Sequence, residues 1–119
     1  MRWLLGAVLT AVLLFTAGQA ARAQDGRASV ETTAELAQMC RMEDHRFCYG
    51  YLNGAGQFYQ ALVQDPDIDM NPFVCPGREV SEEEAIGTFL DWFEQHPDAA
   101  SEPTIDGLFR AWVAAFPCA

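Results

Sequence analysis

The segment from Phe47 to Leu62, FCYGYLNGAGQFYQAL, constrains the fold most, because its hydrophobic pattern fits a helix and no other regular element. Its apolar residues recur at steps of three and four, which is the spacing of one buried helix face. A strand would need strict alternation, and adjacent large side chains such as Tyr51-Leu52 break it. We therefore predict a core helix at the centre of the fold. The residues on its predicted buried face are Cys48, Tyr51, Leu52, Ala55, Phe58, Tyr59 and Leu62.

Two glycines within this segment suggest a close packing contact. Gly50 and Gly54 each cost a helix interior up to ~1 kcal/mol relative to alanine. They lie four residues apart, so they share one side of the helix. We predict that they form a notch against which the backbone of another segment packs.

Residues 1–23 have the features of a secretory signal peptide. Arg2 is followed by an apolar run from Trp3 to Ala17 and then by small residues. Ala21-Arg22-Ala23 fits the A-x-A rule and places cleavage before Gln24, with cleavage after Ala20 as the alternative. The apolar run is shorter than the ~20 residues that a membrane-spanning helix needs. We predict one mature domain, residues 24–119, which is exported to the periplasm and is not held in the membrane.

The mature chain is strongly acidic. Residues 24–119 hold five arginines, no lysine and 17 acidic residues, a net charge of about −12. Nucleic acids and anionic membranes require a basic patch on their partner, so neither is expected to bind. A cationic protein surface is the natural complement, because opposite potentials speed encounter. The alternative is that the charge only confers solubility.

Four cysteines, Cys40, Cys48, Cys75 and Cys118, follow the cleavage site. An even number in a small exported domain predicts two disulfides. No C-x-x-C pair occurs and neither histidine lies near a ligand cluster, so we expect no metal and no cofactor. Three pairings satisfy the count. We favour Cys48–Cys75 and Cys40–Cys118, because Cys75 follows the loop that returns from the central helix and Cys40 and Cys118 each lie at a helix end.

Three further helices complete the predicted fold. Thr32 to Glu35 matches a capping box, which begins a first helix that ends near Met42. A second box at Ser81 to Glu84 begins a third helix, and His96-Pro97 ends it. The last helix begins at Ser101 to Pro103. No strand signal of similar strength occurs, so we predict a small all-α domain of four helices.

The segment after the central helix is a loop rich in proline and aspartate. Asp65, Asp67 and Asp69 match the start of a calcium-binding EF-hand loop. Met70 stands where that loop requires glycine and Pro76 where it requires glutamate, which excludes an EF-hand. Weak cation binding by the three acids is the remaining metal hypothesis.

The sequence offers no arrangement for catalysis. His45 lies at a helix start. His96 lies at a helix C-terminus, where the helix dipole alone favours a histidine. No nucleophile elbow, zinc-protease motif or phosphate-binding glycine loop occurs. We therefore predict that the protein is not an enzyme. Trp92 lies beside Asp91 and off the apolar stripe of its helix, so we predict a partly exposed interface anchor.

Four landmarks recur in an order that resembles the Rap/Tai family of type VI secretion immunity proteins. They are Cys48-Tyr49-Gly50-Tyr51, the segment Cys75-Pro76-Gly77-Arg78-Glu79-Val80, His96-Pro97 and Phe116-Pro117-Cys118. The second departs slightly from the family pattern, because Gly77 and Arg78 separate Pro76 from Glu79-Val80. The resemblance covers nearly all of the mature chain.

The resemblance implies a small, helical, periplasmic protein that binds and blocks an amidase effector that cuts peptidoglycan cross-links. The contact would use Asp65, Asp67 and Asp69, with Trp92 as an anchor. A homodimer is a further partner hypothesis. The alternative function is a periplasmic acid-stress or general chaperone of the HdeA-like kind, which is also small, helical, acidic and disulfide-bonded.

Overall fold

The computed structural model describes residues 30–119, so the predicted signal peptide at 1–23 lies outside the described residues. Within that range the chain forms four α-helices, and the short 3-10 helix η1 (Pro97–Ala99) precedes the last of them. The α-helices are α1 (Thr33–Arg41), α2 (Arg46–Gln64), α3 (Glu82–Gln95) and α4 (Thr104–Ala115). The extended pairing found among the described residues is a single antiparallel bridge between Thr32 and Pro103. The predicted all-α class with four helices is confirmed.

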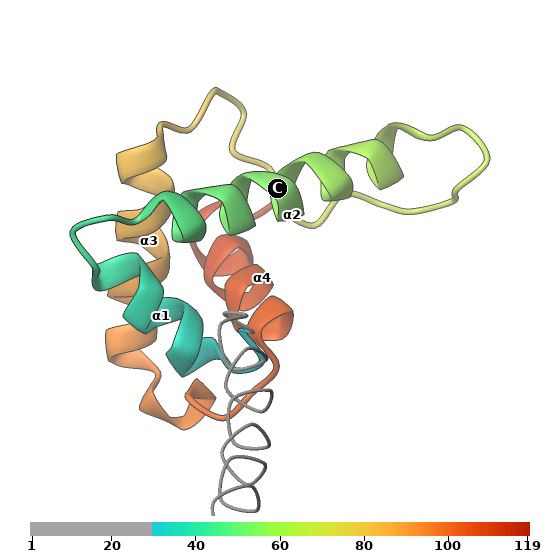
Figure 1. Cartoon of the computed structure of the whole chain (residues 1–119). Coiled ribbons are helices and arrows are strands. Elements are labelled where there is room, and N and C mark those ends of the chain that lie inside the picture. The colour runs from blue at the N-terminus through green and yellow to red at the C-terminus, as the bar shows by residue number, and fades with distance from the viewer. Residues whose placement is uncertain (1–29) are drawn as a thin grey trace, which may run out of the picture.

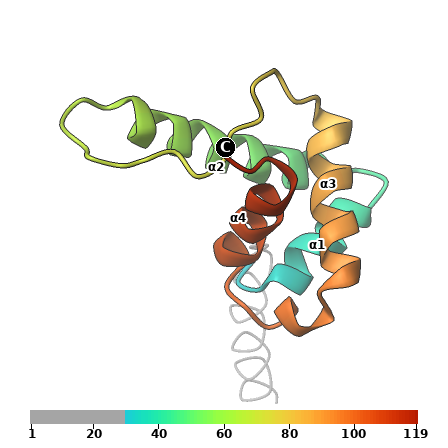
Figure 2. The same ribbon diagram turned by 180° about the vertical axis from the view of Figure 1, so that it is seen from behind.

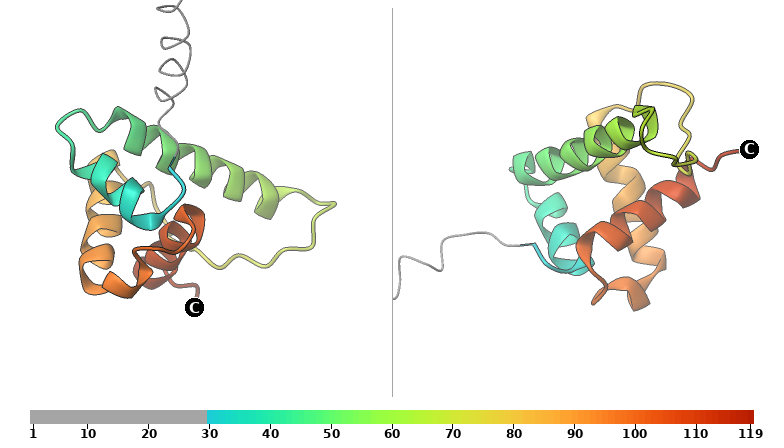
Figure 3. Two further views of the ribbon diagram at one scale, coloured as in Figure 1. Left: turned by 60° about the horizontal axis from the view of Figure 1, so that its bottom comes forward. Right: turned by 90° about the vertical axis from the view of Figure 1, so that its right-hand side faces the viewer.

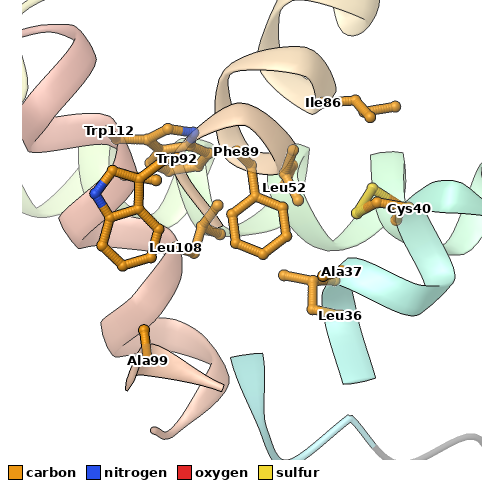
Figure 4. Packing of buried hydrophobic residues seen from close by; sticks show 12 residues of the cluster. Leu36, Ala37, Cys40, Leu52, Ile86, Phe89, Trp92, Ala99, Leu108 and Trp112 are labelled. Atoms are coloured by element: carbon orange, nitrogen blue, oxygen red, sulfur yellow. A yellow bond between two sulfur atoms is a disulfide. The ribbon is translucent and has the colours of Figure 1, made fainter. Parts of the chain in front are cut away.

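The core lies between α1, α3 and α4, and α2 lies across one end of these three helices (Figure 1). Leu36 from α1, Phe89 from α3 and Leu108 from α4 are fully buried. Their side chains gather in the middle of the core, as Figure 4 shows. Burying an apolar side chain of this size is worth about 1.5–3 kcal/mol, so each of these three side chains contributes substantially to the stability of the fold.

The prediction that α2 is the centre of the fold is wrong. Of its 19 residues, Cys48, Leu52 and Tyr59 are buried. The first half of α2 covers the other helices, whereas its second half extends beyond them (Figure 1 and Figure 2). Phe58, which the sequence pattern placed on the buried face, is 66 % exposed. The three-and-four spacing identifies the helix correctly, but its buried residues end at Tyr59, and Phe58 does not meet the core.

The prediction that Gly50 and Gly54 form a packing notch on α2 is also wrong, because both glycines are exposed. A Cβ atom built at either glycine would meet no described heavy atom within 4 Å. The close approach lies instead at Gly107 on α4, where a Cβ atom would lie 2.8 Å from Thr33 Cβ on α1 and nearer still to the hydroxyl and methyl of that threonine. The absence of a side chain at Gly107 therefore allows α4 to pack on α1.

The N-terminal ends of α1 and α4 are held together by reciprocal hydrogen bonds. The backbone amide and hydroxyl of Thr33 donate to the carbonyl of Glu102, at 2.9 and 3.1 Å. The amide of Thr104 donates to the carbonyl of Glu31 at 3.2 Å, and its hydroxyl donates to the carbonyl of Val30 at 3.2 Å. Both threonines are buried. Each helix thus has its first amide satisfied by the segment that precedes the other helix.

The predicted helix caps form, one completely and one in part. Thr32 and Glu35 make both bonds of a capping box, and the backbone amides that Glu35 accepts hold its pKa below the usual value. The hydroxyl of Ser81 accepts from the amide of Glu84 at 3.2 Å. The carboxylate of Glu84 pairs with Arg78 at 2.8 Å, which lowers its pKa, and this pairing takes the place of the predicted bond back to Ser81.

All four cysteines form disulfides, as predicted, but the pairing that we favoured is wrong. The bonds are Cys40–Cys48 and Cys75–Cys118. The first joins the last turn of α1 to the first turn of α2, across a tight connection. The second holds the C-terminal tail against the loop before α3, where the amide of Cys75 also donates to the carbonyl of Phe116 at 2.8 Å. The loop returns to the middle of α2 and not to its start, so Cys75 stays away from Cys48.

Candidate functional site

The second half of α2 and the loop that follows it project from the body of the protein as an arm, residues 57–72. Figure 1, Figure 2 and the left view of Figure 3 show this segment extending beyond the other helices. Most of its residues are exposed. A segment that few other residues cover is the part of this fold that is most available to a partner.

The arm carries negative charge that no arginine among residues 30–119 neutralises. Asp65, Asp67 and Asp69 are exposed at its tip, where the C-terminal end of the α2 dipole adds to their potential. The carboxylate of Asp65 accepts from the amide of Asp67 at 2.9 Å, which shapes the turn. No arginine in residues 30–119 pairs with these three acids. Each described arginine pairs with another carboxylate, in the pairs Arg41–Glu94, Arg46–Asp44, Arg78–Glu84 and Arg110–Glu102.

Exposed apolar side chains occur along the arm and directly after it. Phe58 projects from α2, Ile68 lies between the aspartates, and Phe73, directly after the arm, is 42 % exposed. Exposed apolar groups that are rimmed by polar ones are typical of protein interfaces. The spacing did contain a signal that Phe58 is exposed. The buried residues Cys48, Leu52 and Tyr59 lie on one narrow face of the helix, and Phe58 lies to the side of that face.

Tyr59 attaches the returning loop to α2. Its hydroxyl accepts from the amides of Phe73 and Val74, at 2.8 and 3.0 Å. Its ring packs against Phe73 at 4.8 Å and against Phe109 at 5.6 Å between centroids. One buried side chain therefore fixes where the loop turns back toward the core.

Replacing Tyr59 with phenylalanine should free the loop while retaining the ring contacts. Two partly buried amides would lose their acceptor, which typically costs about 1–3 kcal/mol. We expect the free energy of unfolding, measured by urea denaturation, to fall by that amount. Amide hydrogen exchange should accelerate at Phe73 and Val74 but not in α3. Unchanged exchange at these two amides would contradict the role of the Tyr59 hydroxyl as their hydrogen-bond acceptor.

A groove lies between α2, the loop after the arm, the start of α3 and the end of α4. Its volume is about 340 Å³. Leu52, Trp112 and Phe116 contribute apolar surface, and Gly56 leaves one side of α2 open to the groove. A Cβ atom at Gly56 would lie 3.8 Å from the Trp112 ring. Part of its lining belongs to the arm, so the two features form one continuous surface; these residues are Gln57, Tyr59, Gln60, Val63, Gln64 and Pro72.

Trp92 lies elsewhere and is not exposed, contrary to the prediction. Its side chain is 8 % exposed. The His96 ring stacks on it at 4.3 Å between centroids, and the Arg110 guanidinium carbon lies 5.1 Å from the centroid of the Trp92 ring. His96 Nδ1 also lies 2.8 Å from the carbonyl oxygen of Trp92. A partner would reach Trp92 only by displacing these side chains.

The remaining histidine joins two helix starts. His45 Nε2 lies 3.5 Å from a Glu82 carboxylate oxygen, which links α2 to α3. In the described part of the chain, no group of three histidine, cysteine, aspartate or glutamate side chains could hold a metal ion. The features that distinguish this surface are therefore the acidic arm and the groove, both of which suit contact with a protein.

Comparison with known proteins identifies the family. The family model described as Rap1a immunity proteins matches residues 32–118, which include all four α-helices and both disulfides. The chain belongs to the Rap1a immunity protein family. Searches of curated proteins and of solved structures gave no match.

Membership of the Rap1a family implies the kind of partner. Immunity proteins act by binding an effector protein and are typically not enzymes, so the partner of this Rap1a-family protein is a protein. Among residues 30–119, no helix combines the length and the apolar character that crossing a membrane requires.

Proposed function

We propose that this protein is a periplasmic immunity protein that binds and inhibits a type VI secretion effector, and that the effector is a peptidoglycan amidase. The observation that carries the proposal is the Rap1a family match over residues 32–118. An effector that cuts the cell wall acts in the periplasm, where two disulfides are also stable. The predicted signal peptide at residues 1–23 would deliver the protein there.

We further propose that the arm meets the effector. Asp65, Asp67 and Asp69 present negative charge beyond the body of the protein, and no arginine among the described residues neutralises it. A basic surface around the effector's active site is the matching partner. Charges of this kind mainly govern the rate of association, whereas apolar contacts such as those of Phe58 govern dissociation.

Replacing Asp65, Asp67 and Asp69 with asparagine tests the arm. We expect the association rate with the proposed amidase effector to fall roughly tenfold at low salt, because the steering potential is lost. The dissociation rate should change much less. Raising the salt concentration should slow association of the wild-type protein and have little effect on the variant, as measured by surface plasmon resonance.

A second triple variant, Glu43→Gln, Asp91→Asn and Asp98→Asn, is the matched control. It removes the same net charge from exposed positions outside the arm. If both variants slow association equally, the effect comes from the net charge of the protein and the proposed role of the arm is wrong. If the wild-type protein forms no complex at micromolar concentrations, the proposed function is wrong for this pair.

A further inference from the structure

The groove beside the arm has the chemistry of a peptide-binding site. Four carboxamide side chains follow one edge of α2 at helical spacing, namely Asn53, Gln57, Gln60 and Gln64. A carboxamide both donates and accepts hydrogen bonds, so a row of them can pair with successive amides and carbonyls of an extended backbone. Val80, before α3, and Trp112 and Phe116, at the end of α4, add apolar side chains to the lining.

The charge of the groove narrows the choice of occupant. Glu82 is the one charged residue among the described residues that line it, and it lies at the α3 end. A second copy of the mature chain would bring a further net charge of about −12 against the same surface, which opposes association. A neutral or cationic segment meets no such repulsion. At about 340 Å³, the groove is at the small end of ligand sites and suits a few residues of a peptide.

We propose that the groove binds an extended segment of the effector, with an apolar side chain seated over Gly56 and a basic residue near Glu82. The inference rests on the proposed function, and it adds a second contact to that of the arm. The carboxamide row holds the segment's backbone, while Trp112 and Phe116 enclose the apolar side chain. Contact at both places anchors the effector more firmly than the acidic arm alone, so loss of the groove should act on dissociation.

Gly56→Leu tests this site with little risk to the fold. A Cβ atom at Gly56 meets Trp112 at an ordinary van der Waals distance of 3.8 Å, so the backbone need not move. The added side chain would occupy the groove. Gly54→Leu is the matched control, because it makes the same change two residues away, where no described heavy atom lies within 4 Å of the Cβ position. Both changes replace a helical glycine with a better helix former.

We expect Gly56→Leu to weaken binding of the amidase effector 10- to 100-fold, mainly through faster dissociation, and Gly54→Leu to change it less than twofold. The double variant Gln57→Ala, Gln60→Ala removes the carboxamides without filling the groove, and we expect it to weaken binding about tenfold. Thermal melting should show that all three proteins are folded.

The failures of the two proposals are distinguishable. If the wild-type protein binds the effector and Gly56→Leu binds equally well, the groove proposal is overturned and the proposed function stands. If Gly56→Leu leaves effector binding unchanged but turns a wild-type dimer into a monomer in sedimentation, the occupant is a second copy, which also overturns the inference. If the wild-type protein does not bind the effector, the proposed function itself fails.

Discussion

Replacing Cys75 and Cys118 with alanine should lower the free energy of unfolding by roughly 4 kcal/mol. The disulfide joins positions 43 residues apart, and the chain-entropy model assigns about that value to a loop of this length. The loss is a large share of the 5–15 kcal/mol that stabilises a typical domain. The same change should loosen the C-terminal tail. Without the disulfide, the described backbone hydrogen bond between the loop and the tail is the one from the Cys75 amide to the Phe116 carbonyl. Urea denaturation of residues 24–119 measures the effect.

The second disulfide provides the comparison. Cys40 and Cys48 are 8 residues apart, for which the same model gives roughly 2.5 kcal/mol. Their side chains are buried, so the alanine pair also loses packing in the core. A loss below about 1 kcal/mol for the Cys75 and Cys118 variant would contradict the account. Four free thiols detected in the unfolded wild-type protein would contradict both disulfides.

Gly107→Ala should destabilise the protein although alanine is the better helix former. The new methyl group would overlap Thr33, a buried β-branched side chain whose hydroxyl is held by the carbonyls of Glu102 and Pro103 at 3.1 and 3.2 Å. Thr33 cannot rotate away without losing these bonds. Overpacking of this kind costs about 1–3 kcal/mol, which exceeds the gain of up to ~1 kcal/mol in helix propensity.

Gly54→Ala should change stability in the opposite direction. The Cβ position at Gly54 meets no described heavy atom within 4 Å, so the gain in helix propensity is unopposed. We expect this variant to be more stable than the wild-type protein by up to ~1 kcal/mol in urea denaturation. Equal effects of alanine at the two glycines would show that the packing of α4 on α1 is not as described.

Local signals in the sequence were sufficient to predict the helices. The box at Thr32 marks where α1 begins, and His96-Pro97 marks where α3 ends. These features act within one or two helical turns, so they operate wherever the helix lies. The four cysteine-, proline- and aromatic-containing landmarks also led to the correct family. Local chemistry and the order of the motifs were therefore enough to predict the class of fold and the kind of partner.

The arrangement of the helices depends on what covers each face, which the pattern of one segment does not reveal. Spacing placed Phe58 on a buried face, but it is 66 % exposed in the part of α2 that extends beyond the other described helices. Gly54 and Gly107 are both glycines within helices, and only the position of α1 distinguishes them. Trp92 lies off its stripe, yet His96 and Arg110 cover it. The acids of the arm were predictable as a candidate surface, whereas the groove requires four segments to be in place.

The most direct test of the central claim is a titration of the peptidoglycan amidase effector that we propose as the partner of this protein. Peptidoglycan cleavage should be measured while residues 24–119 are added in increasing amounts. We predict that cleavage falls linearly and ends at about one equivalent, because a tight inhibitor acts by occupying its target stoichiometrically. Full amidase activity in the presence of excess protein would contradict the proposed function.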